Sequence, residues 1–222
     1  MDVLTAAGFK NSIDVSRETL DRLSIYVDLL NKWQKSINLV GPKTMADAWR
    51  RHILDSAQLF SYIENRDNLV FDLGSGAGFP GLVLAIMGAK NVVLMESNQK
   101  KCSFLGEVIR QTACSAKVFN GRIKDYPEQK TAKYITSRAL APLDQLCAWS
   151  YPLLVPEGKC LFLKGETYKQ ELTLCQKKWN IEVQIHPSLI NLDKDGDGDK
   201  DVLPQNLPGV LIELGKLSPR DG

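Results

Sequence analysis

Residues 69–81 read L-V-F-D-L-G-S-G-A-G-F-P-G, a short apolar run that stops at an acid and continues into closely spaced glycines. The run predicts a buried strand, and the glycines after it predict a loop that binds a nucleotide. Gly74, Gly76 and Gly78 lack a Cβ atom, so the loop backbone can adopt positive φ and lie close against a ligand. Pro80 suits the first turn of a helix, and the segment after it is almost wholly apolar. The stretch therefore predicts the start of a βαβ unit, with its ligand at the carboxyl end of the strand.

Segments typical of strands and helices alternate through the rest of the chain. Strands are predicted at 69–73, 91–95, 115–119, 133–137, 159–163, 180–185 and 209–214, and helices at 80–88, 99–112, 143–151 and 167–178. Such alternation implies a mainly parallel sheet with helices on both faces. The last two strands, separated by a long polar loop, are expected to pair as an antiparallel hairpin. The fold class is therefore α/β, with a seven-stranded, mostly parallel sheet.

Two amphipathic segments precede the first strand. Residues 16–36 begin with Ser16 as an N-cap and carry apolar residues at helical spacing. After a break, a second helix is predicted to begin at Thr44. Nucleotide-binding domains of dehydrogenases usually open directly with the strand and do not need such helices. We therefore expect an N-terminal helical cap at 1–66 and a second domain at 67–222, together forming one compact unit.

The composition is that of an ordinary globular protein, with 44% hydrophobic and 24% charged residues among 222. Five cysteines are scattered without a C-x-x-C pair, which argues against a zinc site and against a disulfide framework. The first residues do not resemble a secretion signal, and no stretch approaches the roughly 20 apolar residues of a membrane span. We therefore expect a cytoplasmic protein with no metal site and no membrane partner.

The net charge of +2 hides an acidic segment. Residues 193–201 hold five aspartates against two lysines, a charge of −3, which leaves +5 for the rest of the chain. Acids at alternate positions of 193–204 imitate an EF-hand calcium loop, but Pro204 stands where the bidentate glutamate should be, and strands rather than helices are predicted on both sides. We expect a solvated hairpin loop here rather than a calcium site.

Two cofactor classes fit a glycine loop after the first strand. Gly76, Gly78 and Gly81 satisfy G-x-G-x-x-G, and Glu96 ends the next strand, as in NAD(P)-dependent dehydrogenases. Asp72 ahead of alternate glycines instead favours S-adenosylmethionine, which carries a sulfonium and an amino group but no pyrophosphate. Glu96 fits both classes, because a carboxylate can accept hydrogen bonds from both ribose hydroxyls. An NAD(P)-dependent oxidoreductase therefore stays open as an alternative.

Five motifs extend beyond the glycine loop. They are H-I-L-D-S at 52–56, D-L-G-S-G-A-G-F-P-G at 72–81, E-S-x-x-K-K-x-x-F-L at 96–105, S-R-A at 137–139 and L-K-G at 163–165. Together they resemble the glucose-inhibited division protein B family, bacterial methyltransferases that act on guanine N7 in 16S rRNA of the small ribosomal subunit. The resemblance runs in register from about Leu20 to Lys178. It implies a Rossmann-like class I methyltransferase sheet and S-adenosyl-L-methionine as the cofactor.

The resemblance implies roles for individual positions. Gly74 and Phe79 match loop positions that hold the methionine part of the cofactor, and the backbone of Ile123 and Lys124 matches the pair that flanks the adenine. Arg138 matches the arginine beside the methyl-transfer site and is the expected catalytic residue. The family usually has glutamate at Lys124, so only a backbone contact could persist there. The expected cofactor-binding residues are Asp72, Gly74, Gly76, Gly78, Phe79, Glu96, Ile123, Lys124 and Arg138.

Guanine N7 carries an in-plane lone pair and no proton, so its methylation needs no general base. The enzyme mainly aligns the nucleophile, the methyl group and the sulfur. We therefore assign no base, and expect His52 either to line the pocket and contact RNA or to be a core or helix-surface histidine with a local hydrogen bond, for example to Asp55. Arg122 and Lys164 fall at or just past strand ends on the ligand side and are candidate RNA-binding residues. An arginine that the family commonly has before the last strand is missing at 208–210.

The residues and the resemblance together predict methyl transfer from S-adenosylmethionine to N7 of a guanine in 16S rRNA. Besides the oxidoreductase, a non-catalytic RNA-binding ribosome assembly factor with the same fold stays open. The modest net charge favours recognition of RNA by its folded shape, so an intact ribosomal particle is expected to be a better substrate than naked rRNA. We expect the protein to act as a monomer.

Overall fold

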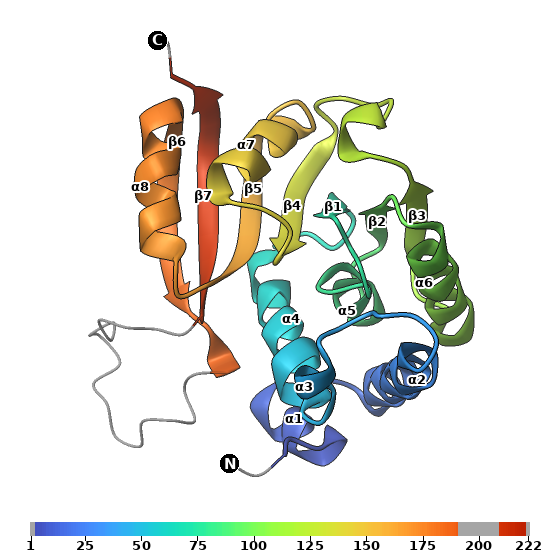
Figure 1. The fold of residues 1–222 in the computed structure, drawn as a ribbon. Helices are drawn as coiled ribbons and strands as arrows, with labels where there is room; N and C mark the ends of the chain where they lie inside the picture. Colours follow the sequence, from blue (N-terminus) through green and yellow to red (C-terminus); the bar gives the residue numbers. More distant parts are fainter. Residues whose placement is uncertain (1–2, 191–208, 221–222) are drawn as a thin grey trace, which may run out of the picture.

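One sheet organises the structure, a computed structural model that describes residues 3–190 and 209–220. Its strands are β1 (Leu69–Leu73), β2 (Asn91–Glu96), β3 (Ala116–Asn120), β4 (Ala132–Arg138), β5 (Leu154–Gly165), β6 (Trp179–Pro187) and β7 (Gly209–Pro219). They follow the order β3-β2-β1-β4-β5-β7-β6, and all neighbours are parallel except the pairs that β7 makes with β5 and β6. The predicted seven-stranded, mostly parallel sheet and its antiparallel hairpin are therefore confirmed (Figure 1).

Helices cover both faces of this sheet. They are α1 (Ala6–Ser12), α2 (Arg17–Gln34), α3 (Pro42–Met45), α4 (Asp55–Ala57), α5 (Gly81–Ile86), α6 (Gln99–Thr112), α7 (Leu143–Ser150) and α8 (Tyr168–Lys178), with a π-helical turn η1 (Trp49–Leu54) and two 3-10 turns, η2 (Gln58–Tyr62) and η3 (Ile123–Asp125). Val70 belongs to the apolar cluster under α5 and α6, and its neighbour Phe71 belongs to the cluster under α7 and α8. Because β1 is buried on both faces, it reads as a continuous apolar run.

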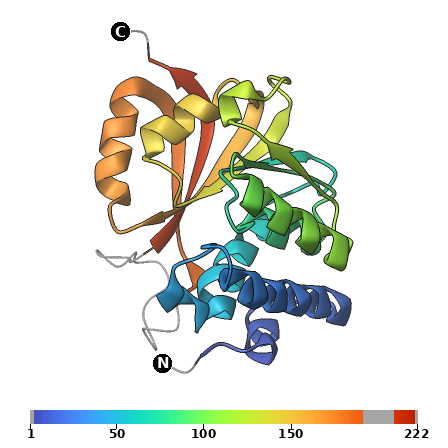
Figure 2. The ribbon, with the colours of Figure 1, turned by 45° about the vertical axis from the view of Figure 1, so that its right-hand side comes forward.

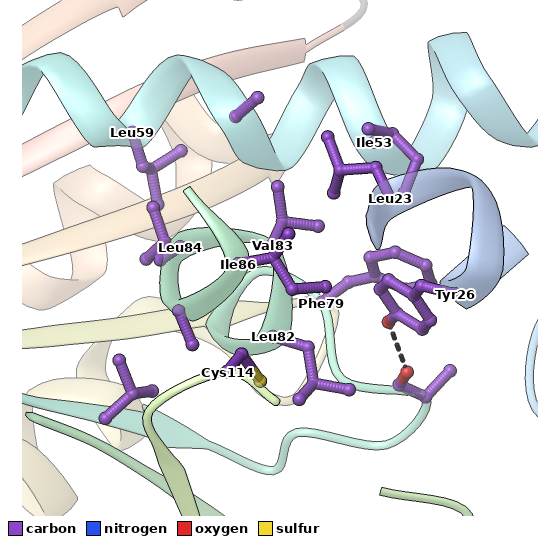
Figure 3. Close-up of a cluster of buried hydrophobic side chains, with 14 of the residues drawn as sticks. Leu23, Tyr26, Ile53, Leu59, Phe79, Leu82, Val83, Leu84, Ile86 and Cys114 are labelled. Carbon is purple, nitrogen blue, oxygen red and sulfur yellow. Dashed lines mark hydrogen bonds between the residues drawn. The ribbon is translucent and has the colours of Figure 1, made fainter. Parts of the chain in front are cut away.

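The N-terminal helices lie at the end of the sheet toward which β4 points (Figures 1 and 2). Ser16 caps α2 as predicted, because its Oγ accepts a hydrogen bond from the backbone N–H of Thr19 at 3.1 Å. Leu23, Tyr26 and Leu30 of this helix are buried in the same apolar cluster as residues of α5 and α6. Figure 3 shows Leu23 and Tyr26 beside Leu82 and Val83 of α5. The cap and the sheet domain thus share a hydrophobic core.

The second predicted helix is not continuous. Helix α3 ends at Met45, and after a turn the helical path resumes through η1, α4 and η2 as far as Tyr62. All residues from His52 to Leu59 are buried, polar ones included. A helical period alone cannot reveal a π-helical turn, because the same apolar spacing suits an α-helix. Such wide turns occur mostly as local bulges, frequently at functional sites.

Helix α1 is absent from the sequence prediction. Thr5 caps it by accepting a hydrogen bond from Gly8 N at 3.2 Å, and Phe9 is its one buried residue. The Phe9 ring lies 5.6 Å from that of Trp49. A helix with one buried side chain leaves no repeating apolar pattern, so periodicity could not have found it.

Two further points concern the extent of the elements. Strand β5 begins at Leu154, five residues before its predicted start, because Pro156 and Gly158 obscure the strand pattern there. The acidic segment 193–204, predicted to be a solvated hairpin loop rather than a calcium site, lies outside the described residues. No helix in the described parts of the chain is long and apolar enough to cross a membrane.

Candidate active site

A cavity of about 1280 Å³ opens at the carboxyl ends of β1, β2 and β4. Its walls come from the glycine loop, the end of β2, the η3 turn, the segment after β4 and the N-terminal cap. This position matches the ligand site of open α/β sheets. Ten of the predicted site residues line it: His52, Gly74, Gly76, Phe79, Glu96, Arg122, Ile123, Lys124, Arg138 and Lys164. Asp72 and Gly78 do not.

The glycine loop has the backbone that its sequence predicts. Gly74, Gly76 and Gly78 adopt φ values of 62°, 57° and 97°, in a region that disfavours residues with a Cβ. Gly78 lies outside the cavity wall because its Cα faces Leu82 and Tyr26 instead. Its contribution is therefore to the shape of the loop.

Glu96 ends β2 opposite this loop. Its Oε2 accepts a hydrogen bond from Gly76 N at 2.9 Å, and its Oε1 accepts one from Asn98 N at 2.7 Å. Asn98 itself caps α6 by accepting from the N–H groups of Lys100 and Lys101. Two backbone donors thus fix the carboxylate at the cavity wall, and each oxygen retains a lone pair for a ligand hydroxyl.

Asp72 lies beneath the loop. The side chain is fully buried, and its Oδ1 accepts a hydrogen bond from the Thr136 hydroxyl at 2.9 Å, which ties β1 to β4. Burial raises the pKa of Asp72 to about 6, against the effect of its hydrogen bonds. The predicted direct contact with a cofactor would require an exposed carboxylate, so this geometry assigns Asp72 a supporting position instead. A strand-end acid in the sequence does not reveal whether its side chain faces the cavity or the core.

Arg138 reaches across the cavity from the end of β4. Its Nη1 donates a hydrogen bond to the carbonyl oxygen of Arg51 at 2.9 Å and lies 3.6 Å from Asp55 Oδ2. Its guanidinium carbon is 4.8 Å from the centre of the Phe79 ring. Burial lowers the pKa of Arg138, and the neighbouring carboxylate of Asp55 opposes this change. The side chain is therefore held by the cap on one side and by the glycine loop on the other.

Asp55 is a site residue that sequence reasoning did not identify. Its Oδ1 accepts hydrogen bonds from Gln58 Nε2 at 2.9 Å and from the Ser188 hydroxyl at 3.0 Å. Burial raises the pKa of Asp55, while the charge of Arg138 lowers it. The only available signal was its place in H-I-L-D-S, since its partners Arg138 and Ser188 are far away in the sequence.

His52 lines the cavity and is also buried with a local hydrogen bond, but its partner is Thr44 and not Asp55. Its Nε2 lies 2.9 Å from the hydroxyl of Thr44, and that hydroxyl donates to the carbonyl of Gly41 at 2.7 Å. Thr44 Oγ1 can then only accept, which puts the imidazole proton on Nε2. The ring stacks on Phe79 with 5.0 Å between centres. Burial, reinforced by the charges of Arg138 and Arg51, lowers the pKa of His52 to about 3, so the ring is neutral near pH 7.

This pKa predicts a pH-dependent stability that His52→Gln removes. Between pH 6.5 and about 3 the native state binds fewer protons at His52 than the unfolded chain, so its contribution to stability falls as the pH falls. The free energy of unfolding of the wild type relative to His52→Gln should drop by about 2 kcal/mol between pH 7 and pH 5. Urea titrations followed by fluorescence and circular dichroism measure this. The variant is needed as a reference because Asp72, whose pKa is raised, contributes more to stability as the pH falls. If the stability of wild type and variant depended on pH in the same way, the lowered pKa of His52 would be contradicted.

The basic candidates differ in their surroundings. Lys164 forms an ion pair with Glu171 at 2.6 Å and donates to the carbonyl of Ala141 at 2.9 Å, so an RNA phosphate would compete with these partners. Arg122 and Lys124 line the opposite wall, and within the described residues neither forms an ion pair. Arg122 and Lys124 are therefore more accessible to an RNA phosphate than Lys164.

The sequence matches a known protein family. The GidB family model, described as rRNA small subunit methyltransferase G, matches residues 19–197. The chain belongs to this family. A relative named ribosomal RNA small subunit methyltransferase G from Paramagnetospirillum magneticum is 53% identical over 188 residues, which cover 85% of this chain and 88% of the relative. A relative of the same name from Rhodospirillum centenum is 42% identical and covers 97% of this chain and 92% of its own length.

Solved structures agree with this methyltransferase family at the level of fold. A TehB-like S-adenosylmethionine-dependent methyltransferase from Corynebacterium glutamicum has a TM-score of 0.59 at 14% identity and covers 87% of this chain and 99% of its own. M. jannaschii TYW2 in complex with AdoMet has a TM-score of 0.54 at 13% identity, covering 77% of each chain. The sheet is therefore of the Rossmann-like methyltransferase type, as expected. An oxidoreductase is not favoured.

The site of this methyltransferase fits S-adenosylmethionine. The positive φ values at Gly74 and Gly76 allow close approach of a ligand to the loop, and the carboxylate of Glu96 is held where it can accept from hydroxyls. A cavity of about 1280 Å³ leaves space for a nucleoside cofactor together with part of a second ligand. We therefore expect both the cofactor and the methyl acceptor to enter this cavity.

Proposed function

We propose that the protein transfers a methyl group from S-adenosylmethionine to N7 of a guanine in 16S rRNA. The observation that carries this proposal is the composition of the cavity, whose lining combines the glycine loop and Glu96 with Arg138 and several other cationic side chains. Family membership supports the reaction class and the rRNA substrate. When bound, the cofactor supplies an electrophilic methyl group on a positively charged sulfur.

We infer that the cofactor is held by the residues that the family resemblance implies. Glu96 would accept hydrogen bonds from the ribose hydroxyls, and the backbone of Ile123 and Lys124 would flank the adenine. Gly74 and Phe79 would contact the methionine part. The cavity supports these assignments because each of these residues lines it.

Among the residues that the structure describes, none at the site is poised as a general base, which agrees with a nucleophile that bears no proton. His52 is neutral near pH 7, and its Nε2 is already bonded to Thr44. The carboxylate of Asp55 is shared among Gln58, Ser188 and Arg138. The chain's contribution is thus to bind and orient the reactants, and we propose that Arg138 orients the base at the methyl-transfer site.

The rim of the cavity supports an RNA substrate. Cationic side chains line it from the cap, from α6 and from the η3 segment, and they can contact phosphates. These are Arg51, Lys101, Arg122 and Lys124, together with Arg50, which is largely buried and paired with Asp47 at 3.7 Å. Because the net charge of the whole chain is only +2, we propose that the folded shape of the RNA within the small ribosomal subunit contributes much of the recognition.

The direct test is incubation with labelled S-adenosylmethionine and small ribosomal subunits that lack the modification, followed by mapping of the labelled base. We expect label at N7 of one guanine in 16S rRNA, and a faster reaction with intact subunits than with naked rRNA. Absence of label under turnover conditions would overturn the proposal. Binding to subunits without methyl transfer would instead favour the non-catalytic assembly factor. Calorimetric titration with S-adenosylmethionine and with NADH tests the oxidoreductase alternative, which requires binding of NADH.

We also propose that residues 1–66 form the cap and residues 67–222 the methyltransferase domain, and that the two unfold as one unit. The apolar cluster that joins Tyr26 and Leu30 to Leu82 and Phe104 supports this, because neither part buries its apolar surface alone. Two separate transitions in the urea titrations would contradict it. The proposed substrate implies a cytoplasmic location, and we propose a monomer, which sedimentation analysis tests.

A further inference from the structure

We propose that Tyr26, a residue of the N-terminal cap, is a positioning residue for the cofactor-binding loop. The inference rests on the proposed binding of S-adenosylmethionine at this loop. It gives the cap a task in the chemistry of the site besides packing. Tyr26 belongs to α2 and is 51 positions from Ala77 of the loop in the sequence, so no motif links the two.

The link is a hydrogen bond from a side chain to the loop backbone. The hydroxyl of Tyr26 donates to the carbonyl oxygen of Ala77 at 2.5 Å, and both residues are buried (Figure 3). Burial raises the pKa of Tyr26 well above its usual value, so the hydroxyl keeps its proton and remains a donor. A buried carbonyl that lost this donor would have no access to water as a replacement.

Ala77 occupies a sensitive place in the loop. It lies between Gly76 and Gly78, both with positive φ, and its carbonyl belongs to the same peptide unit as the N–H of Gly78. The N–H of Gly76 donates to Glu96, and the N–H of Gly78 donates to the carbonyl of Ser75 at 2.6 Å. Tyr26 fixes the carbonyl of the residue between them, so it restrains the segment that holds Gly76 against Glu96.

The ring of Tyr26 restrains the next residue as well. It stacks on Phe79 with 5.1 Å between centres and 25° between planes. Phe79 in turn stacks on His52 at 5.0 Å and has the Arg138 guanidinium 4.8 Å from its ring centre. One side chain of the cap thus holds the loop at two points, through a hydrogen bond at Ala77 and a ring contact at Phe79.

The test separates the hydroxyl from the ring. Tyr26→Phe removes the donor and keeps the stacking, and Tyr134→Phe is the matched control. Tyr134 is also fully buried, and its hydroxyl accepts one hydrogen bond, from Glu64 N at 3.2 Å, outside the cavity lining. Both variants should lower the melting temperature. Calorimetric titration with S-adenosylmethionine and with S-adenosylhomocysteine then measures cofactor affinity directly, without reference to methyl transfer.

We expect Tyr26→Phe to raise the Kd for both ligands about tenfold, the equivalent of one lost hydrogen bond, while Tyr134→Phe leaves it unchanged within about twofold. Equal Kd values for wild type and Tyr26→Phe, or an equal rise in both variants, would overturn the inference. Gly106 lies within α6, and a Cβ added there meets no atom within 4 Å, so Gly106→Ala should stabilise the fold. If Tyr26→Phe gives too little folded protein, the comparison is repeated in the Gly106→Ala background. Failure of the wild type to bind either ligand would instead contradict the proposed function.

Discussion

A Gly78→Ala variant should lose about 3 kcal/mol of folding stability and bind S-adenosylmethionine at least about a hundredfold more weakly. Gly78 has a φ of 97°, which an alanine rarely adopts, so strain arises whatever the space around it. A Cβ there would lie 2.3 Å from Leu82 Cδ1 and 2.9 Å from the hydroxyl of Tyr26. The loop must therefore change shape, and Ala77 would move away from its donor. Urea unfolding and calorimetric titration measure the two losses.

The matched control is Gly106→Ala. Gly106 lies within α6, and a Cβ added there meets no atom within 4 Å. Alanine suits a helix interior better than glycine, so this variant should gain about 0.5–1 kcal/mol with unchanged affinity for the cofactor. If Gly78→Ala kept wild-type stability and affinity, the loop would tolerate another backbone path, and the account of its glycines would fail.

An Arg138→Met variant should lower the rate of methyl transfer at least about a hundredfold and cost about 3 kcal/mol of stability. The loss of rate follows from the proposed role of Arg138 in orienting the base. The loss of stability has a separate cause, because the substitution leaves the carboxylate of Asp55 buried without its cation. Rates on ribosomal subunits at saturating cofactor, together with urea unfolding, give both quantities.

A second substitution separates these two effects. In an Arg138→Met, Asp55→Asn double variant the uncompensated charge is gone, and the amide oxygen can still accept from Gln58 and Ser188. We expect much of the stability to return while the rate stays low. Arg110→Ala is the control for a cation in an exposed pair: its partner Glu107 lies on the same surface of α6, and stability should change little. Recovery of the rate in the double variant would show that Arg138 acts only through stability.

The sequence was sufficient for the sheet and for most of the cavity wall. Central strands such as β1 are buried on both faces and so read as apolar runs, and glycines with positive φ mark the loop between β1 and α5. Because all parallel strands direct their carboxyl ends to one edge, residues at strand ends such as Glu96 and Arg138 could be expected to meet there. These predictions depend on the local pattern of apolar residues and glycines, and on the small number of ways in which alternating strands and helices can form a parallel sheet.

The parts that could not be predicted depend on contacts between distant residues. The pairing of Asp55 with Arg138 and Ser188 joins three segments that are far apart in the sequence, and nothing in their spacing indicates that they meet. The burial of Asp72 beneath the loop is decided by side-chain direction at a strand end, which no sequence pattern reports. The π-helical turn at η1 has the apolar spacing of an α-helix. The periodicity of apolar residues along the chain predicts none of these three features.

The stacking of Phe79 between Tyr26 and His52 makes the cap and the cofactor site thermodynamically linked. A ligand that favours the ordered loop also favours the arrangement of α2 and η1 that supports it, since binding only to the folded form stabilises that form by mass action. The dependence is reciprocal. A partner whose binding favours the same arrangement of the cap raises the affinity for the cofactor by the factor by which the cofactor raises the affinity for that partner. A partner that docked on the cap and favoured this arrangement would then prepare the site for its cofactor before any acceptor entered the cavity.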